Sequence, residues 1–279
     1  MNPIFPPQAV PAAARLLRLR DGLAALPDFG PLYLQARGIG GGLGKAIRTF
    51  QPIFVEGLDF AFDPDAGAGF SIRDLSAIHA VKAGDGSYFS GSLEFEFDDW
   101  PQGLGLHLMP DEEGARRLTI GEFVASVPST PLEEEALEVW RESRRKPAPM
   151  CPCCRERARH RARFPERHPL HAILHHALVH RLDLEVRLSA PHADLSATFS
   201  PGRIEVRDGY LVVSDAPALH ALHLDMARLH ALAIDTTRLD GCDYAFLRLF
   251  DPRGMATFQI LCEDASLATL WREFCESAD

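Results

Sequence analysis

Histidines are concentrated in one short stretch of the chain. Five of the 12 histidines fall within thirteen residues: His168, His171, His175, His176 and His180. On a helix, His171 and His175 share a face at a spacing of four, and His168 lies above His171 at a spacing of three. Imidazole is the commonest nitrogen ligand for haem iron and for zinc. This spacing predicts a haem or metal site, and the alternative is a polar helix face.

Three cysteines lie just upstream in the run Cys151-Pro152-Cys153-Cys154. Cys151 and Cys154 have the C-x-x-C spacing with which two thiolates hold one zinc ion. His160 is a candidate for a further ligand, and His168 is another. The alternative is a set of unpaired thiols in a surface linker.

The charge is distributed unevenly. The chain has 29 Lys or Arg and 39 Asp or Glu, a net charge of −10, yet residues 141–167 hold ten basic residues and three Glu. Such a basic strip in an acidic protein can bind an anionic ligand, but a solvated connector between domains is the simpler interpretation. Nucleic acid is therefore not an expected partner.

The sequence predicts a cytosolic protein. Residues 1–11 lack a basic region followed by an apolar one, and no apolar stretch approaches the length of a membrane span, so we expect neither secretion nor membrane insertion. Thiols stay reduced in the cytosol, so disulfides are not expected. A homodimer is an oligomeric state that the sequence leaves open.

An internal repeat organises the chain. Residues 74–81 resemble residues 225–232 at an offset of 151, and other matched pairs keep offsets of 151 to 153. This period is far longer than that of solenoids, so it indicates domain duplication. The expected boundaries are 8–130 for the first repeat, 131–167 for a helix and a basic Cys/Arg-rich linker, and 168–279 for the second repeat.

Each repeat shows the same order of local signals. An apolar-periodic helix opens it, at residues 12–26 and 170–182, and another closes it, at residues 118–127 and 267–276. Alternating or β-branched segments between them predict strands, and Gly38 to Gly44 predicts a mobile loop. The first predicted strand segments are 53–62, around a turn at Gly57, and 203–213, around a turn at Asp208-Gly209. The other predicted strands are 69–73, 78–82, 92–97 and 104–109, then 218–224, 229–234, 244–250 and 255–261. The predicted fold is α+β, with two tandem repeats of antiparallel β-sheet and flanking helices.

The second repeat contains the runs Ala221-Leu222-His223-Leu224 and Leu247-Arg248-Leu249-Phe250-Asp251, with Gly254 and Trp271. In these residues the chain resembles the haem-utilisation and haem-degrading proteins of the HemS/ChuS/ChuX type. It implies a tandem-repeat haem fold. It also implies that His171, in Pro169-Leu170-His171-Ala172, is the counterpart of the axial ligand. The helical spacing adds His168 and His175 as candidate cofactor ligands, and Arg167 of the basic linker is a candidate partner of a haem propionate.

Two functions follow from these observations. The first is a haem-binding protein of iron and haem utilisation, for which carriage and degradation are not distinguished by sequence. The alternative is a non-enzymatic duplicated scaffold with a zinc site at Cys151, Cys154 and His160. Among the remaining signals, no P-loop, Ser-His-Asp order or paired carboxylate points to another catalytic chemistry.

Overall fold

The computed structural model describes residues 12–55, 59–84, 87–98, 103–110, 114, 118–143, 150–190, 192–217 and 219–270. Residues 267–270 of the predicted closing helix are helical, whereas residues 271–276, with Trp271, lie outside the described residues, as does the turn expected at Gly57.

The first half is dominated by strands. It contains β1 (Ala13–Leu16), α1 (Leu19–Ala24), the 3-10 helix η1 (Leu26–Phe29), β2 (Leu32–Gly38), β3 (Gly41–Ile47), β4 (Ile53–Val55), β5 (Phe60–Asp63), β6 (Ala68–Ser71), β7 (Leu75–Lys82), β8 (Gly91–Phe97), β9 (Leu104–Leu108) and α2 (Ile120–Ser126). A capping box starts α2, because the Thr119 hydroxyl accepts from the Glu122 N–H while the Glu122 carboxylate accepts from the Thr119 N–H.

Helices separate the two halves, and the strand pattern then repeats. The order is β10 (Ser129–Pro131), α3 (Glu134–Ser143), α4 (Pro152–Arg163), η2 (Pro165–Arg167), α5 (Pro169–His180), β11 (Leu184–Ser189), β12 (Ala193–Phe199), β13 (Arg203–Arg207), β14 (Tyr210–Ser214), β15 (His220–Asp225), β16 (Ala231–Leu239), β17 (Cys242–Phe250) and β18 (Ala256–Cys262).

The two halves exchange strands. A ten-stranded sheet has the order β10-β1-β7-β8-β9-β2-β3-β15-β14-β13, and an eight-stranded sheet has the order β16-β17-β18-β11-β12-β6-β5-β4. Every described pairing is antiparallel. Each half thus lends three consecutive strands to the sheet of the other half, and the copies are joined through both sheets.

The strand bounds differ between the two matched segments of the repeat. His79 lies inside β7, whereas His230, its partner at the offset of 151, lies one residue before β16. The match of residues 74–81 with residues 225–232 therefore does not put the two histidines at the same point of a strand.

The core lies where the two sheets face each other. Strands β11 and β12 lie against β2 and β3, and the ring of Phe70 from β6 meets the ring of Phe95 from β8 at 5.3 Å, edge to face. Both rings are fully buried. Because β6 belongs to the eight-stranded sheet and β8 to the ten-stranded sheet, this contact joins the two layers.

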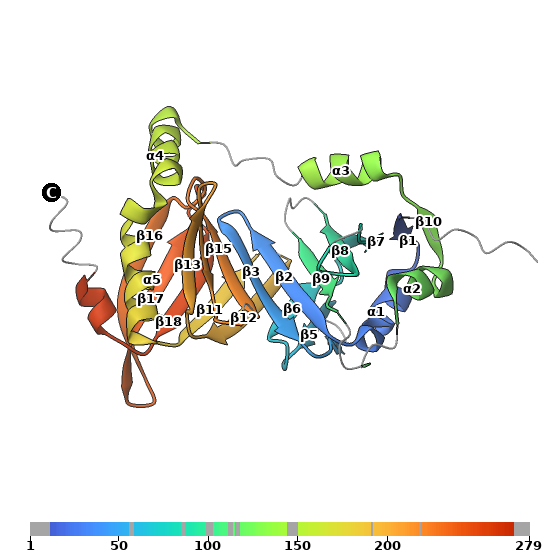
Figure 1. The fold of residues 1–279 in the computed structure, drawn as a ribbon, viewed down its shortest axis with the longest axis horizontal. Helices are drawn as coiled ribbons and strands as arrows, with labels where there is room; N and C mark the ends of the chain where they lie inside the picture. The colour runs from blue at the N-terminus through green and yellow to red at the C-terminus, as the bar shows by residue number, and fades with distance from the viewer. Residues whose placement is uncertain are drawn as a thin grey trace, which may run out of the picture.

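Helices lie at the ends and along one side of the layers. Figure 1 shows α5 and β16 toward one end of the molecule, α1 and α2 toward the other, and α3 and α4 along the same long side. Within α5, the apolar residues Leu170, Ile173, Leu174 and Ala177 are buried in the core. The helix predicted at residues 170–182 is therefore confirmed.

Three local predictions were wrong. Residues 12–26 form a strand and a short helix instead of one helix, because Ala13 to Arg15 pair with β7 and a separate 3-10 helix begins at Leu26, with Pro27 in its first turn. The predicted loop at Gly38 to Gly44 is the β2–β3 hairpin in the middle of a sheet. Residues 152–163 of the expected linker form helix α4.

Candidate functional site

A cavity of about 1020 Å³ opens on the outer face of the ten-stranded sheet, the face turned away from the core. Its floor comes from β2, β3, β9 and β13 to β15, and α3 contributes Glu138 and Arg141 to its wall. Both halves of the chain therefore build it, through the strand exchange.

Strand alternation places the polar side chains in this cavity. In β2, Leu34 and Ala36 are buried in the core, while Gln35 and Arg37 line the cavity. In β15, Leu222 and Leu224 are buried in the same way, so that His223 projects from the outer face. His107 projects from β9 for the same reason, next to the buried Leu106.

Glycines of β3 and β9 leave space above the sheet for the side chains of the cavity. Gly42 of β3 lies directly opposite His223 and contributes no side chain beside it. At Gly105 of β9, an added Cβ would lie 3.2 Å from the His107 Nε2, so the His107 ring occupies the space above that glycine. The glycine-rich run therefore lines a cavity as a strand.

Burial favours the neutral form of two imidazoles in the cavity. Burial lowers the pKa of both His107 and His223, and the nearby Arg37 guanidinium lowers the pKa of His223 further. A neutral imidazole has a free lone pair, which is the form that ligates a metal. The His107 ring also packs against Phe89, with ring centroids 5.0 Å apart.

Charged pairs form the rim. Arg141 of α3 binds both Glu94 of β8 and Glu138, which attaches α3 to the sheet and raises the pKa of Arg141. The Arg228 Nε lies 3.2 Å from the Asp225 carboxylate. Two of the acidic side chains in the lining are thus neutralised by arginines already in place.

Helix α4 rests on this rim. The Arg161 guanidinium donates to the carbonyl oxygens of Met226 and Leu229, which lie in the turn between β15 and β16. Ala162 of α4 also packs on the turn between β13 and β14, where a Cβ added to Gly209 would lie 3.3 Å from the Ala162 Cβ. The basic segment therefore covers the strand ends beside Arg207 and Asp208, which line the cavity.

The histidines predicted from their density lie on α5 and are not among the residues that line the cavity. The rings of His171 and His175 are stacked with centroids 6.1 Å apart, in agreement with their shared helix face. Burial, followed by the charge of His175, lowers the pKa of His171. The Arg167 guanidinium lies 4.6 Å above the Phe164 ring.

His168 has a structural role at the start of α5. As N-cap, its Nδ1 accepts a hydrogen bond from the Leu170 N–H at 3.2 Å, which requires that nitrogen to be unprotonated. Burial, followed by the charge of Arg161, lowers the pKa of His168 to about 4.

We expect His168 to make the protein acid-sensitive. From pH ~6.5 down to about 4 the unfolded chain takes up a proton that the folded protein does not, so the free energy of unfolding falls by up to ~1.4 kcal/mol per pH unit. His168→Asn keeps a capping acceptor and removes this titration. Urea unfolding at pH 7 and pH 5 should show a loss smaller by about 1–2 kcal/mol in the variant. Equal losses in both proteins would contradict this role.

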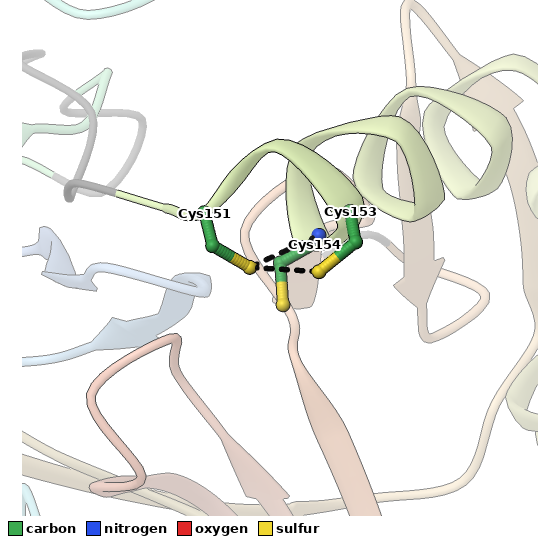
Figure 2. Close-up of side chains that lie close together, drawn as sticks. All are labelled: Cys151, Cys153 and Cys154. Carbon is green, nitrogen blue, oxygen red and sulfur yellow. Dashed lines mark hydrogen bonds between the residues drawn. The ribbon is translucent and has the colours of Figure 1, made fainter.

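The three cysteines come together at the start of α4 (Figure 2). The sulfur atoms of Cys151, Cys153 and Cys154 all lie within 4.8 Å of one another. Hydrogen bonds from Cys153 and Cys154 lower the pKa of Cys151 to about 7. His160, the predicted further ligand, is exposed near the other end of α4 and packs on Phe164, with ring centroids 5.3 Å apart. Among the residues that the structure describes, the metal-ligand cluster consists of the three thiols.

The cavity residues His107, Arg37 and Tyr210 were not predicted from the sequence. His223 was noted only as part of a strand motif. The available signal was a polar residue between two buried leucines in a strand, as in Leu106-His107-Leu108 and Leu222-His223-Leu224. This signal identifies a sheet face, and it does not reveal that a helix and turns enclose that face.

Comparisons with solved structures identify proteins of the same fold. The structure aligns with the haem-binding protein PhuS of Pseudomonas aeruginosa at a TM-score of 0.60 and 15% identity, over 92% of this chain and 83% of PhuS. It aligns with ChuS, a haem oxygenase of Escherichia coli, at 0.62 and 16% identity, over 94% and 88%. The chain has the fold of PhuS and ChuS. The α+β expectation of a duplicated haem-utilisation fold is thereby confirmed.

At these identities the likeness to PhuS and ChuS concerns the fold. No protein-family model matches the sequence, and no curated protein matches it. Within the described part of the chain, none of the helices has the length and apolar character needed to cross a membrane.

Proposed function

We propose that this chain is a cytosolic haem-binding protein of iron and haem utilisation, and that haem binds in the cavity on the outer face of the ten-stranded sheet. The observation that carries the proposal is the meeting of neutral imidazoles, arginines and a glycine floor in one cavity of about 1020 Å³. A cavity of that size is at the upper end of the range for small-molecule and cofactor sites. The shared fold with proteins that bind or degrade haem supports it.

The residues present fit haem. Bound haem would bring an iron atom that accepts a neutral imidazole as axial ligand. His223 is our candidate, because its two cross-strand neighbours on the floor, Gly42 and Val212, present no polar side chain beside the imidazole. His107 is the second imidazole of the same cavity.

Arginines of the lining suit the two propionates. Arg37 and Arg207 both line the cavity, from β2 and β13. The side chain of Arg207 is 82% exposed, and its Nε lies 3.8 Å from the carboxylate of its neighbour Asp208. This exposed ion pair is weak, so the guanidinium can turn toward a propionate. The acids Glu94 and Asp225 are already paired with arginines, which reduces their repulsion of an anionic ligand.

The residues predicted from sequence form a second candidate set. His171, His175, His168 and Arg167 lie on or beside α5, and they remain our alternative location for the iron ligand and a propionate partner. His168 is the weakest of them, because its Nδ1 already caps the helix.

A hemin titration tests the proposal. Wild-type protein should give a saturable change in the Soret region at one haem per chain, with visible bands of a histidine-ligated iron. A linear, unsaturable change, equal to that of an unrelated protein of similar charge, would overturn the proposal. Product analysis after adding a reductant and oxygen would then separate carriage from degradation.

The cysteine cluster favours a second candidate function. In that alternative the duplicated sheets are a scaffold, and a metal centre at the start of α4 regulates or binds a partner. It requires no haem.

A further inference from the structure

The first turn of α4 gathers three thiols on one side. Cys151 is the N-cap residue and Pro152 is the first helical residue, so the chain turns into the helix immediately before Cys153 and Cys154. Figure 2 shows the three sulfur atoms pointing to a common region beside the helix start. Cys151 and Cys153 are exposed, and Cys154 is partly buried.

The spacing of the sulfur atoms suits a single ion. A zinc–sulfur bond of ~2.3 Å places two thiolates of a tetrahedral site ~3.8 Å apart. The Cys151 and Cys153 sulfurs are 2.9 Å apart, and no pair in the cluster exceeds 4.8 Å. The observed separations bracket the required one, so side-chain rotations alone can bring all three sulfurs to bonding distance.

The surroundings favour an anionic centre. One Zn²⁺ with three thiolates carries a net charge of −1. The N-terminal end of a 12-residue helix carries partial positive charge, and Arg155, Arg157 and Arg159 follow in the same helix. The Cys154 N–H already donates to the Cys151 sulfur at 3.4 Å, a contact that stabilises thiolate charge.

We propose that Cys151, Cys153 and Cys154 bind one Zn²⁺, with water or an exchangeable ligand in the fourth position. The third protein ligand is Cys153, in place of the His160 expected from the sequence. Three thiolates select a thiophilic ion, and three protein ligands leave the coordination open. The site is independent of the haem proposal, since none of its ligands lines the cavity.

The test is zinc binding by the reduced, chelator-treated full-length protein in the absence of haem. Competition against a chromogenic chelator should give one Zn²⁺ per wild-type chain. Cys153→Ser should weaken binding by about 100-fold, as should Cys151→Ser and Cys154→Ser. Replacing Zn²⁺ with Co²⁺ should give thiolate-to-metal charge-transfer absorption that the three variants lose.

Two controls keep the ligand set falsifiable. Cys242→Ser removes an exposed thiol on β17, and His160→Ala removes the imidazole expected from sequence; both should bind zinc as the wild type does. Full binding by Cys153→Ser, a loss in His160→Ala, or no stoichiometric zinc in the wild type would each overturn the proposal. Unchanged circular dichroism of the variants excludes misfolding as the cause of any loss.

Discussion

Phe70→Ala should lower the free energy of unfolding by about 3–5 kcal/mol. Phe70 is fully buried and contacts Phe95 at 5.3 Å and Phe50 at 6.4 Å between ring centroids. Truncation removes a large apolar side chain and leaves a cavity between the sheets. Because β6 comes from the first half and pairs with β12 of the second, the loss should destabilise both halves together.

Urea unfolding followed by far-ultraviolet circular dichroism and by tryptophan fluorescence measures this effect. Both probes should shift to the same lower midpoint, in one transition. Phe54→Ala is the matched control, since Phe54 is 47% exposed on the edge strand β4 and should cost less than about 1 kcal/mol. Two separate transitions in Phe70→Ala would contradict the view that the strand exchange couples the halves.

Gly41→Ala should be comparably damaging, at about 3 kcal/mol or more. Gly41 has φ of 143°, and an added Cβ would lie 1.9 Å from the carbonyl oxygen of His223. That oxygen belongs to β15, the strand that joins the second half to the first-half strands of the ten-stranded sheet. The backbone must therefore move apart at the join between the halves, beside the cavity.

Gly254 is a control that separates the steric clash at Gly41 from the cost of a positive φ alone. Gly254 has φ of 80° with open space around its Cβ position, so Gly254→Ala should cost only about 1 kcal/mol. Thermal and urea unfolding of both variants measure the difference. Equal losses would mean that the close approach of β15 to Gly41 contributes nothing.

Much of the fold could be predicted from local patterns. In the second half, every segment predicted as strand from residue 203 onward contains a strand: residues 203–213 fold as the β13–β14 hairpin, and β16 continues beyond the predicted segment to Leu239. Strand β3 was predicted as a loop because five of the seven residues from Gly38 to Gly44 are glycines, and its strand conformation is imposed by β2 and β15 on its two sides. The exchange of β4–β6 for β13–β15 could not be predicted from local sequence, because the same alternation of residues fits a strand of either sheet.

The candidate sites differ in the same way. The three cysteines lie within four residues of one another, so the cluster could be predicted from the sequence. The predicted third ligand was His160, whereas the structure brings Cys153 to the other two thiols. The cavity is assembled from Arg37, His107, Tyr210 and His223, which lie far apart in the chain. Only the order of the strands in the sheet brings them together. The sequence predicted the ligand on α5 instead, because five histidines are concentrated there.

Hemin titration of two single variants tests the central claim most directly. We predict that His223→Ala binds hemin at least about 10-fold more weakly than the wild type and loses its histidine-ligated spectrum, because the iron ligand in the cavity is gone. His171→Ala, on α5 and outside the cavity lining, should keep both the affinity and the spectrum. The reverse result, with His171→Ala impaired and His223→Ala unchanged, would contradict the cavity assignment and move the haem to α5.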